Sequence, residues 1–592
     1  MSSPRAPSSP ITATIVDFSR VDESSNVDGK PPQSTIETEQ GTLHLQPLRN
    51  KGSKNLRALV TFVPRASTFD RENSASSSDP FRGFFTLFWV SVFLLSVRTY
   101  VTSFETSGYP LSLSFATLIS KDAKVLLISD VVLVSVTALV VPFMTLVHKG
   151  WIRYYWTGVV IQHIYQSLFL GCAVAWTFNR RWPWVQSGFF TLHSLTMLMK
   201  IHSYCSVNGH LSCQNMVHAG ALKTLRHRCQ DSSIGGWDKA HAVALRCREE
   251  KALALRTKGF ADWSHLTRDS GGDSTDGTPP LTSTRATLET SGLRQRLISV
   301  QAVNMAYASS APSRYPVEDE LDETRHILTH HPDPNISELA DILTDLQVEL
   351  TSPSGNGNKQ SIRWPQNITL WNFIDYQLIP TLVYEMQYPR TDRLRPLYLL
   401  EKTVATFGTF TLLYTVTEHY IIPLTPNGEQ PLLRSIIDLI LPFMLCYLLL
   451  FYIIFECICN GFAELSFFAD REFYEDWWNA TSWDEYARRW NKPVHNFLLR
   501  HVYASTISAF GLSKSMATFV TFLLSALAHE LVMAVVTQKI RLYLFLLQMV
   551  QIPLIALGRL PSIRQNKTMG NIVFWLGLLT GFPLLCVAYC AY

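Results

Sequence analysis

The sequence predicts an all-α polytopic membrane protein with about nine transmembrane helices. Of its 592 residues, 47% are hydrophobic and 17% are charged, whereas soluble proteins usually carry about 25% charged residues. The polar residues are concentrated in two segments, 1–80 and 206–369, and most of the remaining sequence is apolar. This uneven distribution indicates a membrane domain with two soluble segments. The net charge of +4 and the lack of a long basic run argue against a nucleic-acid partner.

The two polar segments divide the chain into four regions. Residues 1–80 are predicted to form a disordered cytosolic N-terminus with a basic segment next to the membrane, because this stretch cannot bury enough apolar surface to offset its chain entropy. Residues 81–205 carry four apolar segments, and residues 370–592 carry five more together with the candidate catalytic residues. Residues 206–369 are predicted to be a cytosolic insert, largely of low complexity.

One stretch of the insert, ISELADILTDLQVEL, has its apolar residues at helical spacing. It is expected to be either a docking helix or a solvated amphipathic helix, and the solvated helix is favoured. The positions that define the apolar face are Ile336, Leu339, Leu343, Leu346 and Leu350.

The candidate spans follow from length and composition, because a helix needs about 20 apolar residues to cross a hydrocarbon layer of ~30 Å. Basic residues before the first span and after the second, such as Arg65 and Arg153, place the N-terminus in the cytosol. Arg180 and Arg181 fall on the opposite side and break this pattern. The nine spans are predicted at 84–104, 123–147, 152–176, 183–205, 398–422, 433–458, 517–537, 541–560 and 571–592.

The seventh predicted span contains two ionisable residues, His529 and Glu530, within the apolar run TFLLSALAHELVMAVV. Ionisable groups inside a span are costly and by default mark a functional site. Thr521, Ser525 and His529 lie four residues apart and therefore form one polar stripe. The alternative is an interhelical hydrogen bond that only holds the helices together, and the pairing of His with Glu favours function.

This pair points to acid–base chemistry. An H-E-x-x-H zinc protease is excluded because residue 533 is Met. A neutral His can act as a general base toward a hydroxyl, and Glu530 could orient the imidazole or hold substrate. No G-x-S-x-G motif is present, so the nucleophile is expected to come from a substrate. A transporter or proton pathway that uses the same two residues is the alternative from another class.

A second unusual stretch, FYEDWWN, comprises residues 473–479. Adjacent tryptophans are commonly interfacial anchors, but the two acids indicate hydrogen-bonded partners that fix the shape of a loop. Ser482 and Glu485 have capping-box spacing and predict a helix start, and Pro493 predicts a break in that helix. Asn491 and His495 lie four residues apart, next to the break.

Basic residues surround this segment and could bind an anionic cosubstrate or lipid phosphates. Together with an aromatic rim and a buried His, they suit a substrate with a phosphate-bearing head and an apolar tail, such as acyl-CoA. The basic residues are Arg488, Arg489, Lys492, Arg500 and Lys514.

The sequence resembles the membrane-bound O-acyltransferase (MBOAT) family, in its sterol and diacylglycerol branch. FYEDWWN, WNKPVH and SALAHE carry the resemblance, which covers about residues 81–205 and 370–592. YPRTDRLRP (388–396), NGFAELSFFADREFYEDWWN (460–479) and NFLLRHVY (496–503) are similar to the fungal sterol O-acyltransferases. The diacylglycerol enzymes share the N-x-P-V-H and Q-I-P motifs, but their Gly-Gln-Pro is Gly581-Phe582-Pro583 here, which favours sterol.

The resemblance implies the MBOAT fold, with about nine spans around a reaction chamber in the endoplasmic reticulum membrane, and a homodimer or homotetramer. It implies acyl transfer from acyl-CoA to a sterol such as ergosterol or a precursor, in contact with membrane lipid and with no metal or prosthetic group. His529 matches the catalytic His, and Asn491 and His495 match polar residues of the chamber. The resemblance also assigns Arg488, Tyr503, Lys514 and Ser525 to acyl-CoA, and Phe473, Tyr474, Asp476, Trp477, Trp478 and Asn479 to the FYxDWWN motif.

Overall fold

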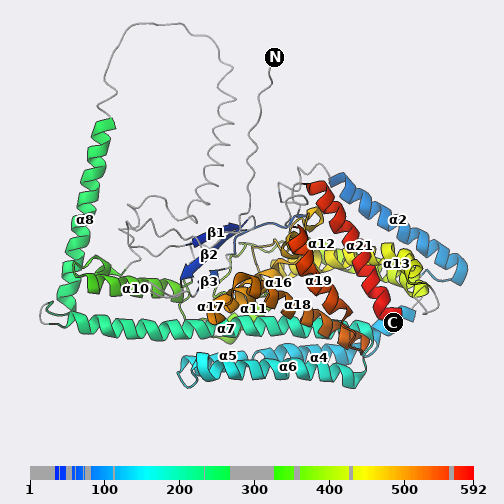
Figure 1. Cartoon of the computed structure of the whole chain (residues 1–592), viewed down its shortest axis with the longest axis horizontal. Helices are drawn as coiled ribbons and strands as arrows, with labels where there is room; N and C mark the ends of the chain where they lie inside the picture. Colours follow the sequence, from blue (N-terminus) through cyan, green and yellow to red (C-terminus); the bar gives the residue numbers. More distant parts are fainter. Residues whose placement is uncertain are drawn as a thin grey trace, which may run out of the picture. The chain divides into compact units, whose positions relative to one another are not determined.

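The described residues form two compact units (Figure 1). The first unit contains Met1–His210 and Pro353–Tyr592, and the second contains Leu211–Ser352, with the boundary inside helix α7 (Trp184–Cys229). The computed structural model describes residues 34–38, 41–47, 56–59, 62–70, 73, 82–110, 114–231, 234–266, 326–352, 361–425, 431–558 and 566–591.

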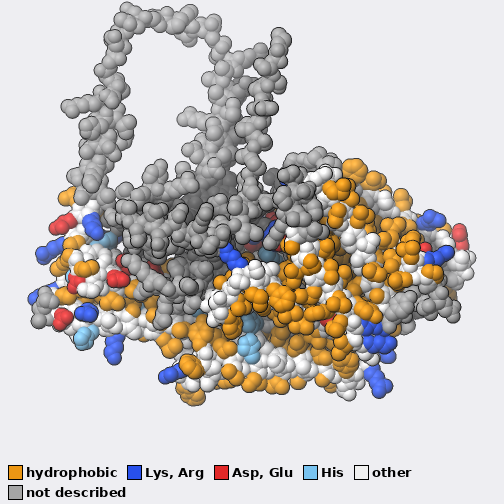
Figure 2. All heavy atoms as spheres, viewed as in Figure 1, with side chains coloured by type: hydrophobic (Ala, Val, Ile, Leu, Met, Phe, Trp, Pro, Cys, Tyr) orange, Lys and Arg blue, Asp and Glu red, His pale blue; other side chains and the backbone are white. Residues whose placement is uncertain are grey.

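The first unit is a polytopic α-helical membrane domain, as predicted. Six of its helical segments within the described ranges are long and apolar enough to cross a membrane. Their outward faces expose large side chains such as Phe84, Leu441 and Leu576, and hydrophobic side chains cover much of the face shown in Figure 2. The six segments are Gly83–Ser107 in α2 (Arg82–Ser107), Ala123–His148 in α4 (Ala123–Thr137) and α5 (Val140–His148), Tyr154–Arg180 in η1 (Tyr154–Gly158) and α6 (Val159–Arg180), Leu432–Leu465 in α13 (Leu432–Phe451), η6 (Tyr452–Ile458) and α14 (Cys459–Leu465), Lys514–Thr537 in α18 (Lys514–Thr537), and Lys567–Cys590 in α21 (Lys567–Ala591).

The other three predicted spans are also helical, in α7, α12 (Pro396–Val416) and α19 (Tyr543–Gly558), but they do not meet the same criteria of length and apolarity. Buried lysines lower the apolar character of two of them: Lys200 in α7 donates to the backbone carbonyl of Ile379 at 2.8 Å, and Lys402 in α12 bonds Glu456. Helix α19 has only 16 residues. The count of nine therefore stays a prediction.

Short helical segments complete the first unit. Four of them are π-helical and each adjoins an α-helix, and π-helical turns often occur at functional sites. The π-helical segments are η1, η4 (Thr417–Ile421), η6 and η8 (Leu498–Tyr503). The remaining segments are α3 (Ser114–Ser120), α11 (Leu370–Leu378), η5 (Ile422–Leu424), η7 (Trp477–Asn479), α15 (Trp483–Arg489), α16 (Lys492–Phe497) and α17 (Ala504–Phe510).

A small antiparallel sheet lies within residues 1–80, where the sequence predicts disorder. Its order is β1 (Ser34–Thr38), β2 (Gly41–Pro47) and β3 (Leu56–Leu59). Ile36 pairs with Leu43, and Leu45 pairs with Ala58.

The second unit tests the helix that the sequence predicts within the insert. Ile336 and Leu350 of α10 (Pro334–Leu350) are fully buried, and Ile336 packs with Leu225 of α7 and Ala240 of α8 (Trp237–Leu266). The helix expected at 336–350 is confirmed, but the preference for a solvated helix is wrong, because neighbouring helices cover its apolar face. The unit contains the end of α7, α8 (Trp237–Leu266), η3 (Ile327–His330) and α10 (Pro334–Leu350), while the low-complexity stretch 269–292 lies outside the described residues.

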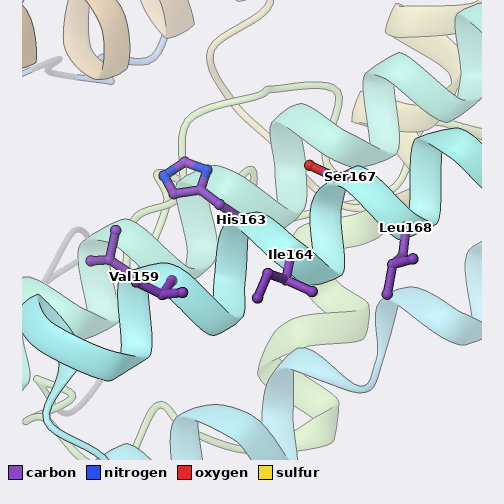
Figure 3. A pocket seen from close by; sticks show the side chains of 6 residues that line it. Val159, His163, Ile164, Ser167 and Leu168 are labelled. Carbon is purple, nitrogen blue, oxygen red and sulfur yellow. The ribbon is translucent and has the colours of Figure 1, made fainter.

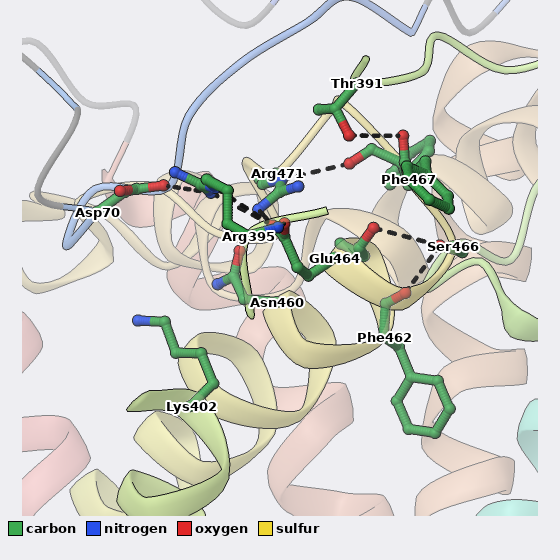
Figure 4. Close-up of polar contacts among 12 residues, drawn as sticks. Asp70, Thr391, Arg395, Lys402, Asn460, Phe462, Glu464, Ser466, Phe467 and Arg471 are labelled. Atoms are coloured by element: carbon green, nitrogen blue, oxygen red, sulfur yellow. Dashed lines mark hydrogen bonds and ion pairs between the residues drawn. The ribbon is translucent and has the colours of Figure 1, made fainter. Parts of the chain in front are cut away.

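Buried ion pairs connect the membrane helices of the first unit to one another and to the FYEDWWN segment. Glu456 of η6 is fully buried and accepts hydrogen bonds from Lys402 Nζ at 2.6 Å and Tyr474 Oη at 3.0 Å. Glu464 of α14 is also fully buried and pairs with Arg395 and Arg471 (Figure 4). These contacts fix the FYEDWWN segment to the membrane helices.

Candidate active site

Helix α18 carries the polar stripe that the sequence predicts. Ser513 caps its start by accepting a hydrogen bond from the Met516 backbone N–H. The residues that follow are mostly apolar, as a membrane span requires, and His529 lies about two thirds of the way along the helix. The imidazole is exposed rather than packed, so other molecules can reach it.

The hydrogen bonds of His529 define its chemistry. Its Nδ1 lies 2.7 Å from the backbone carbonyl oxygen of Ser525 and 3.5 Å from the Ser525 hydroxyl. A carbonyl oxygen can only accept, so Nδ1 carries the proton in this contact. In the neutral imidazole, Nε2 then holds the lone pair and can accept a proton.

His529 lies on the side of α18 that faces α7. Val536 follows it by seven residues, which is close to two helical turns, and therefore shares its face. Val536 packs against Gly188 of α7, where a β-carbon would lie 3.5 Å from Val536 Cγ2. The exposed imidazole lies about two helical turns from this contact, on the same side of α18.

Glu530 has a different position from the one expected. Its buried carboxylate accepts hydrogen bonds from the backbone N–H groups of Leu542 at 2.8 Å and Phe545 at 3.2 Å, and from Tyr589 Oη at 2.8 Å. Leu542 and Phe545 lie at the start of α19, whose N–H groups lack partners within the helix. Glu530 therefore caps α19 and joins it to α21, so the prediction that it orients the imidazole is wrong.

The helix break predicted at Pro493 is confirmed. Helix α15 ends at Arg489, and α16 begins at Lys492 with Asn491 as its N-cap. Asn491 Oδ1 accepts a hydrogen bond from the Val494 backbone N–H at 3.1 Å. The cap uses the oxygen of the amide, so the Nδ2 group is the end that can donate to a substrate. The η8 segment that continues α16 packs against α18, which brings this region alongside the helix of His529.

His495 lies one turn into α16, on the same helix as the Asn491 cap. Burial, together with the positive charge of Arg488 and, to a smaller extent, Lys492, lowers the pKa of His495 from 6.5 to about 4. The imidazole is consequently neutral at physiological pH. A neutral ring can donate or accept a hydrogen bond but adds no charge to the site.

Most of the basic residues predicted to surround the site form ion pairs. Lys492 Nζ lies 2.6 Å from both Glu472 and Glu475, Arg489 pairs with three carboxylates, and Arg500 pairs with Glu385. The two basic residues assigned to acyl-CoA, Arg488 and Lys514, are less buried than Lys492 and Arg500. Arg488 is partly exposed and pairs with Asp484 at 2.6 Å, and Lys514 is the half-buried first residue of α18. Tyr503 ends η8, which packs against α18.

The FYEDWWN segment is a buried junction. Phe473, Tyr474 and Trp477 are almost completely buried, so Trp477 is not an interfacial anchor. Asp476 pairs with Arg489 at 3.1 Å and Glu475 with Lys492 at 2.6 Å, which confirms that the acids fix the loop.

The C-terminal end of the FYEDWWN segment is hydrogen-bonded to α21, the last membrane helix. The Trp478 carbonyl accepts hydrogen bonds from Asn571 and Trp575 of α21, and the Asn479 side chain bonds Asp476 at 3.3 Å. Ser482 caps α15, and Glu485 accepts a hydrogen bond from the Thr481 backbone N–H at 2.7 Å, so the predicted capping box is confirmed in nearly its expected form.

A separate pocket lies along α6 (Figure 3). Its volume is about 460 Å³, and its lining is apolar apart from His163 and Ser167. His529 is not part of this lining. The lining residues are Val159, Val160, His163, Ile164, Ser167 and Leu168.

Sequence analysis missed the buried pair Lys402–Glu456. Glu456 is one of two acids in the apolar run at 433–458, with Asp438 near the start of the run, and the principle that singled out His529 applies equally to it. A salt bridge of 2.6 Å and a hydrogen bond to Tyr474 give Glu456 a structural role at the FYEDWWN junction.

Residues 337–591 match the model of the MBOAT, membrane-bound O-acyltransferase family. The chain is 31% identical over 542 residues to probable sterol O-acyltransferase 1 of Schizosaccharomyces pombe, covering 89% of this chain and 85% of that protein. It is 31% identical over 545 residues to sterol O-acyltransferase 2 of Candida albicans, covering 90% and 78%. Diacylglycerol O-acyltransferase 1 of Dictyostelium discoideum is 36% identical over a shorter stretch of 234 residues, or 38% of this chain.

The cap that Glu530 provides can be tested by substitution. Glu530→Ala removes the acceptor for three backbone N–H groups, those of Arg541, Leu542 and Phe545, and for the phenol of Tyr589, and we expect it to lower the stability by roughly 2–3 kcal/mol. Glu530→Gln keeps one acceptor oxygen and should lose less. The measurement is the thermal unfolding midpoint of the purified chain in detergent, and an unchanged midpoint for Glu530→Ala would contradict the capping role.

The pKa of His495 predicts a pH dependence of stability. Because the pKa of about 4 in the folded protein lies below the ordinary 6.5, protonation favours the unfolded chain. The stability that the neutral ring contributes is complete above pH 6.5 and is lost as the pH falls toward 4. Unfolding midpoints measured from pH 8 to pH 5 should therefore fall more steeply for the unaltered chain than for His495→Asn. Parallel curves would show that His495 does not have a lowered pKa.

Proposed function

Because this chain belongs to the membrane-bound O-acyltransferase family, we propose that it transfers a long-chain fatty acyl group from acyl-CoA to the hydroxyl of a membrane sterol. The relatives that align over most of its length are named sterol O-acyltransferases. The observation that carries the proposal is the His529 imidazole, whose Nδ1–H is bonded to Ser525 while Nε2 is left as a base.

The proposed reaction begins with the sterol hydroxyl at His529. Nε2 accepts the hydroxyl proton as the sterol oxygen attacks the thioester carbonyl carbon of acyl-CoA. The tetrahedral intermediate then collapses, the carbon–sulfur bond breaks, and the ester remains on the sterol oxygen. The proton on Nε2 passes to the departing thiolate, so CoA leaves as the thiol and His529 returns to its neutral form.

Asn491 is the proposed donor to the developing oxyanion. Its Oδ1 is held by the α16 cap, which fixes the plane of the amide and orients Nδ2 before the substrate arrives. One such preorganised donor contributes about 3–4 kcal/mol to transition-state stabilisation in other acyl-transfer enzymes. The neutral His495 one turn later supplies a second polar group without introducing a competing charge.

The cosubstrate is proposed to bind along the run from α15 to the start of α18. Arg488 and Lys514 would contact the phosphates of CoA, while Tyr503 and Ser525 would line the path of the acyl chain toward His529. Arg488 is the more available guanidinium for this purpose, because its partner Asp484 is itself partly exposed and an exposed ion pair costs little to exchange. No metal or prosthetic group is required by this reaction.

The cellular setting is proposed from the family and from the charge distribution. We place the chain in the endoplasmic reticulum membrane with a cytosolic N-terminus, so that CoA is taken up from and released to the cytosol. A homodimer or homotetramer is the proposed assembly. The sterol, ergosterol or a precursor, would enter from the lipid, and the ester would return to it for storage.

Diacylglycerol is the alternative acceptor, favoured by the 36% identity to the Dictyostelium discoideum enzyme over 234 residues. The aromatic residue at 582 favours the sterol. Phe582 lies 5.5 Å from the Tyr447 ring, which in turn stacks with Trp490 at 6.1 Å, so an apolar wall stands where the diacylglycerol enzymes are expected to have Gln. A proton pathway is the less favoured class, because Glu530 is engaged in capping α19 rather than available for proton transfer.

The general base can be tested by substituting His529. His529→Ala should lower the rate of ester formation by about 10²–10⁴-fold, measured with labelled oleoyl-CoA and sterol and the purified full-length chain. His148→Ala is the matched control, because His148 is an exposed histidine at the end of α5, and it should leave the rate unchanged. Ester formation by His529→Ala at the control rate would remove His529 from the mechanism.

The acceptor can be identified by direct competition. Ergosterol, cholesterol and diacylglycerol are supplied together at equal concentrations with labelled oleoyl-CoA, and the labelled products are separated. We expect sterol ester to exceed triacylglycerol, because the aromatic wall at Phe582 suits a rigid apolar acceptor. A dominant triacylglycerol product would assign the chain the diacylglycerol activity instead.

A further inference from the structure

The segment 62–70, here called the N-terminal strap, is attached directly to the catalytic half of the chain. The backbone N–H of Arg65 donates to the Ala469 carbonyl at 3.1 Å, and the Arg65 carbonyl accepts from the Arg471 N–H at 2.9 Å. Phe62 packs edge-on against Tyr388 and Phe468. The strap therefore lies beside the stretch that leads into FYEDWWN, about 400 residues away in sequence.

Arg65 neutralises two acids of that stretch. Its Nε and Nη2 bind both oxygens of Asp470, at 2.9 and 2.8 Å, and its Nη1 lies 2.5 Å from Glu472. Asp470 is buried, and a buried carboxylate requires a partner of opposite charge. A planar guanidinium provides such a two-point contact, which an ammonium cannot.

Glu472 connects Arg65 to α16. The same carboxylate oxygen that binds Arg65 accepts a hydrogen bond from Lys492 Nζ at 2.6 Å, and Lys492 also bonds Glu475 at 2.6 Å. Lys492 is buried and is the first residue of α16. Its backbone N–H donates to the Phe473 carbonyl at 3.1 Å. The charges thus alternate from Arg65 through Glu472 and Lys492 to Glu475.

From this chain of contacts we infer that Arg65 is a positioning residue for acyl transfer, acting through Glu472 and Lys492 on the start of α16. Asn491 precedes Lys492, and His495 follows it within one turn. The inference rests on the proposed function, in which Asn491 donates to the oxyanion. With Arg65 present, Lys492 is shared between two carboxylates. Without Arg65, the uncompensated charge of Asp470 and Glu472 draws the ammonium away from Glu475 and displaces Asn491.

Other contacts hold the strap in place independently of Arg65. Ser67 Oγ donates to Glu456 at 2.5 Å, and Asp70 pairs with Arg395 at 3.0 Å. The Phe69 ring stacks on Phe85 at 4.6 Å. A change confined to the Arg65 guanidinium therefore alters the charge balance at α16 while these anchors remain.

The test compares Arg65→Gln with the double variant Arg65→Gln/Glu472→Gln. For the single variant we expect kcat to fall about ten- to a hundredfold, since small misplacement of a catalytic group has effects of this size, while KM for oleoyl-CoA stays within about twofold. The double variant removes Glu472, the one of the two uncompensated carboxylates that bonds Lys492, and leaves Lys492 with Glu475, so kcat should recover in part. Purified full-length chains are assayed for sterol ester, with kcat expressed per folded protein from size-exclusion profiles and unfolding midpoints.

Arg434→Gln is the matched control, because Arg434 is exposed and pairs only loosely with Asp438, at 3.6 Å, and its kcat should equal that of the unaltered chain. An unchanged kcat for Arg65→Gln would overturn the inference. So would a double variant with a lower kcat than the single one, because a role limited to anchoring the strap makes the two losses add. Absence of ester from the unaltered chain would instead overturn the proposed function itself.

Discussion

The buried carboxylate of Glu456 is the interaction on which the arrangement of the site depends. It is completely buried, in a helix that crosses the membrane region, and it receives hydrogen bonds from Lys402, Ser67 and Tyr474. Leaving such a charge without partners costs several kcal/mol. Helix α12, the N-terminal strap and the FYEDWWN junction must therefore all reach η6 at the same time. This one requirement brings together segments that are separated by hundreds of residues.

The need of a buried carboxylate for hydrogen-bond partners also explains why two adjacent ionisable residues on α18 have different environments. Glu530 is buried, and all of its acceptor capacity is directed to the start of α19 and to Tyr589. His529 is exposed and has a single backbone partner for Nδ1. Successive residues of a helix point about 100° apart, so one faces a neighbouring helix while the other faces open space. The carboxylate caps α19, and the proposed mechanism uses Nε2 of the imidazole as the base.

Local patterns in the sequence predicted the parts of the site that depend on local physics. The cap at Ser482, the break at Pro493 and the stripe that ends at His529 each follow from spacing within a few residues, and each is present. The partners of Glu530 and the docking of Arg65 on Asp470, 405 residues away, depend on tertiary packing that no short window contains. For the same reason the insert helix at 336–350 was predicted correctly, but its burial was not.

The contact between His529 and a backbone carbonyl suits the proposed chemistry better than a contact with a carboxylate would. A carboxylate at Nδ1 would place a full negative charge beside the ring, whereas the Ser525 carbonyl selects the same tautomer without one. In the proposed mechanism, Nε2 is then the atom that accepts the proton of the alcohol. A thiol has a pKa of about 8.5, so the thiolate of CoA leaves with little help from an acid. The site then needs a competent base and an oxyanion donor more than it needs a strong acid, and an imidazole without a carboxylate partner meets that need.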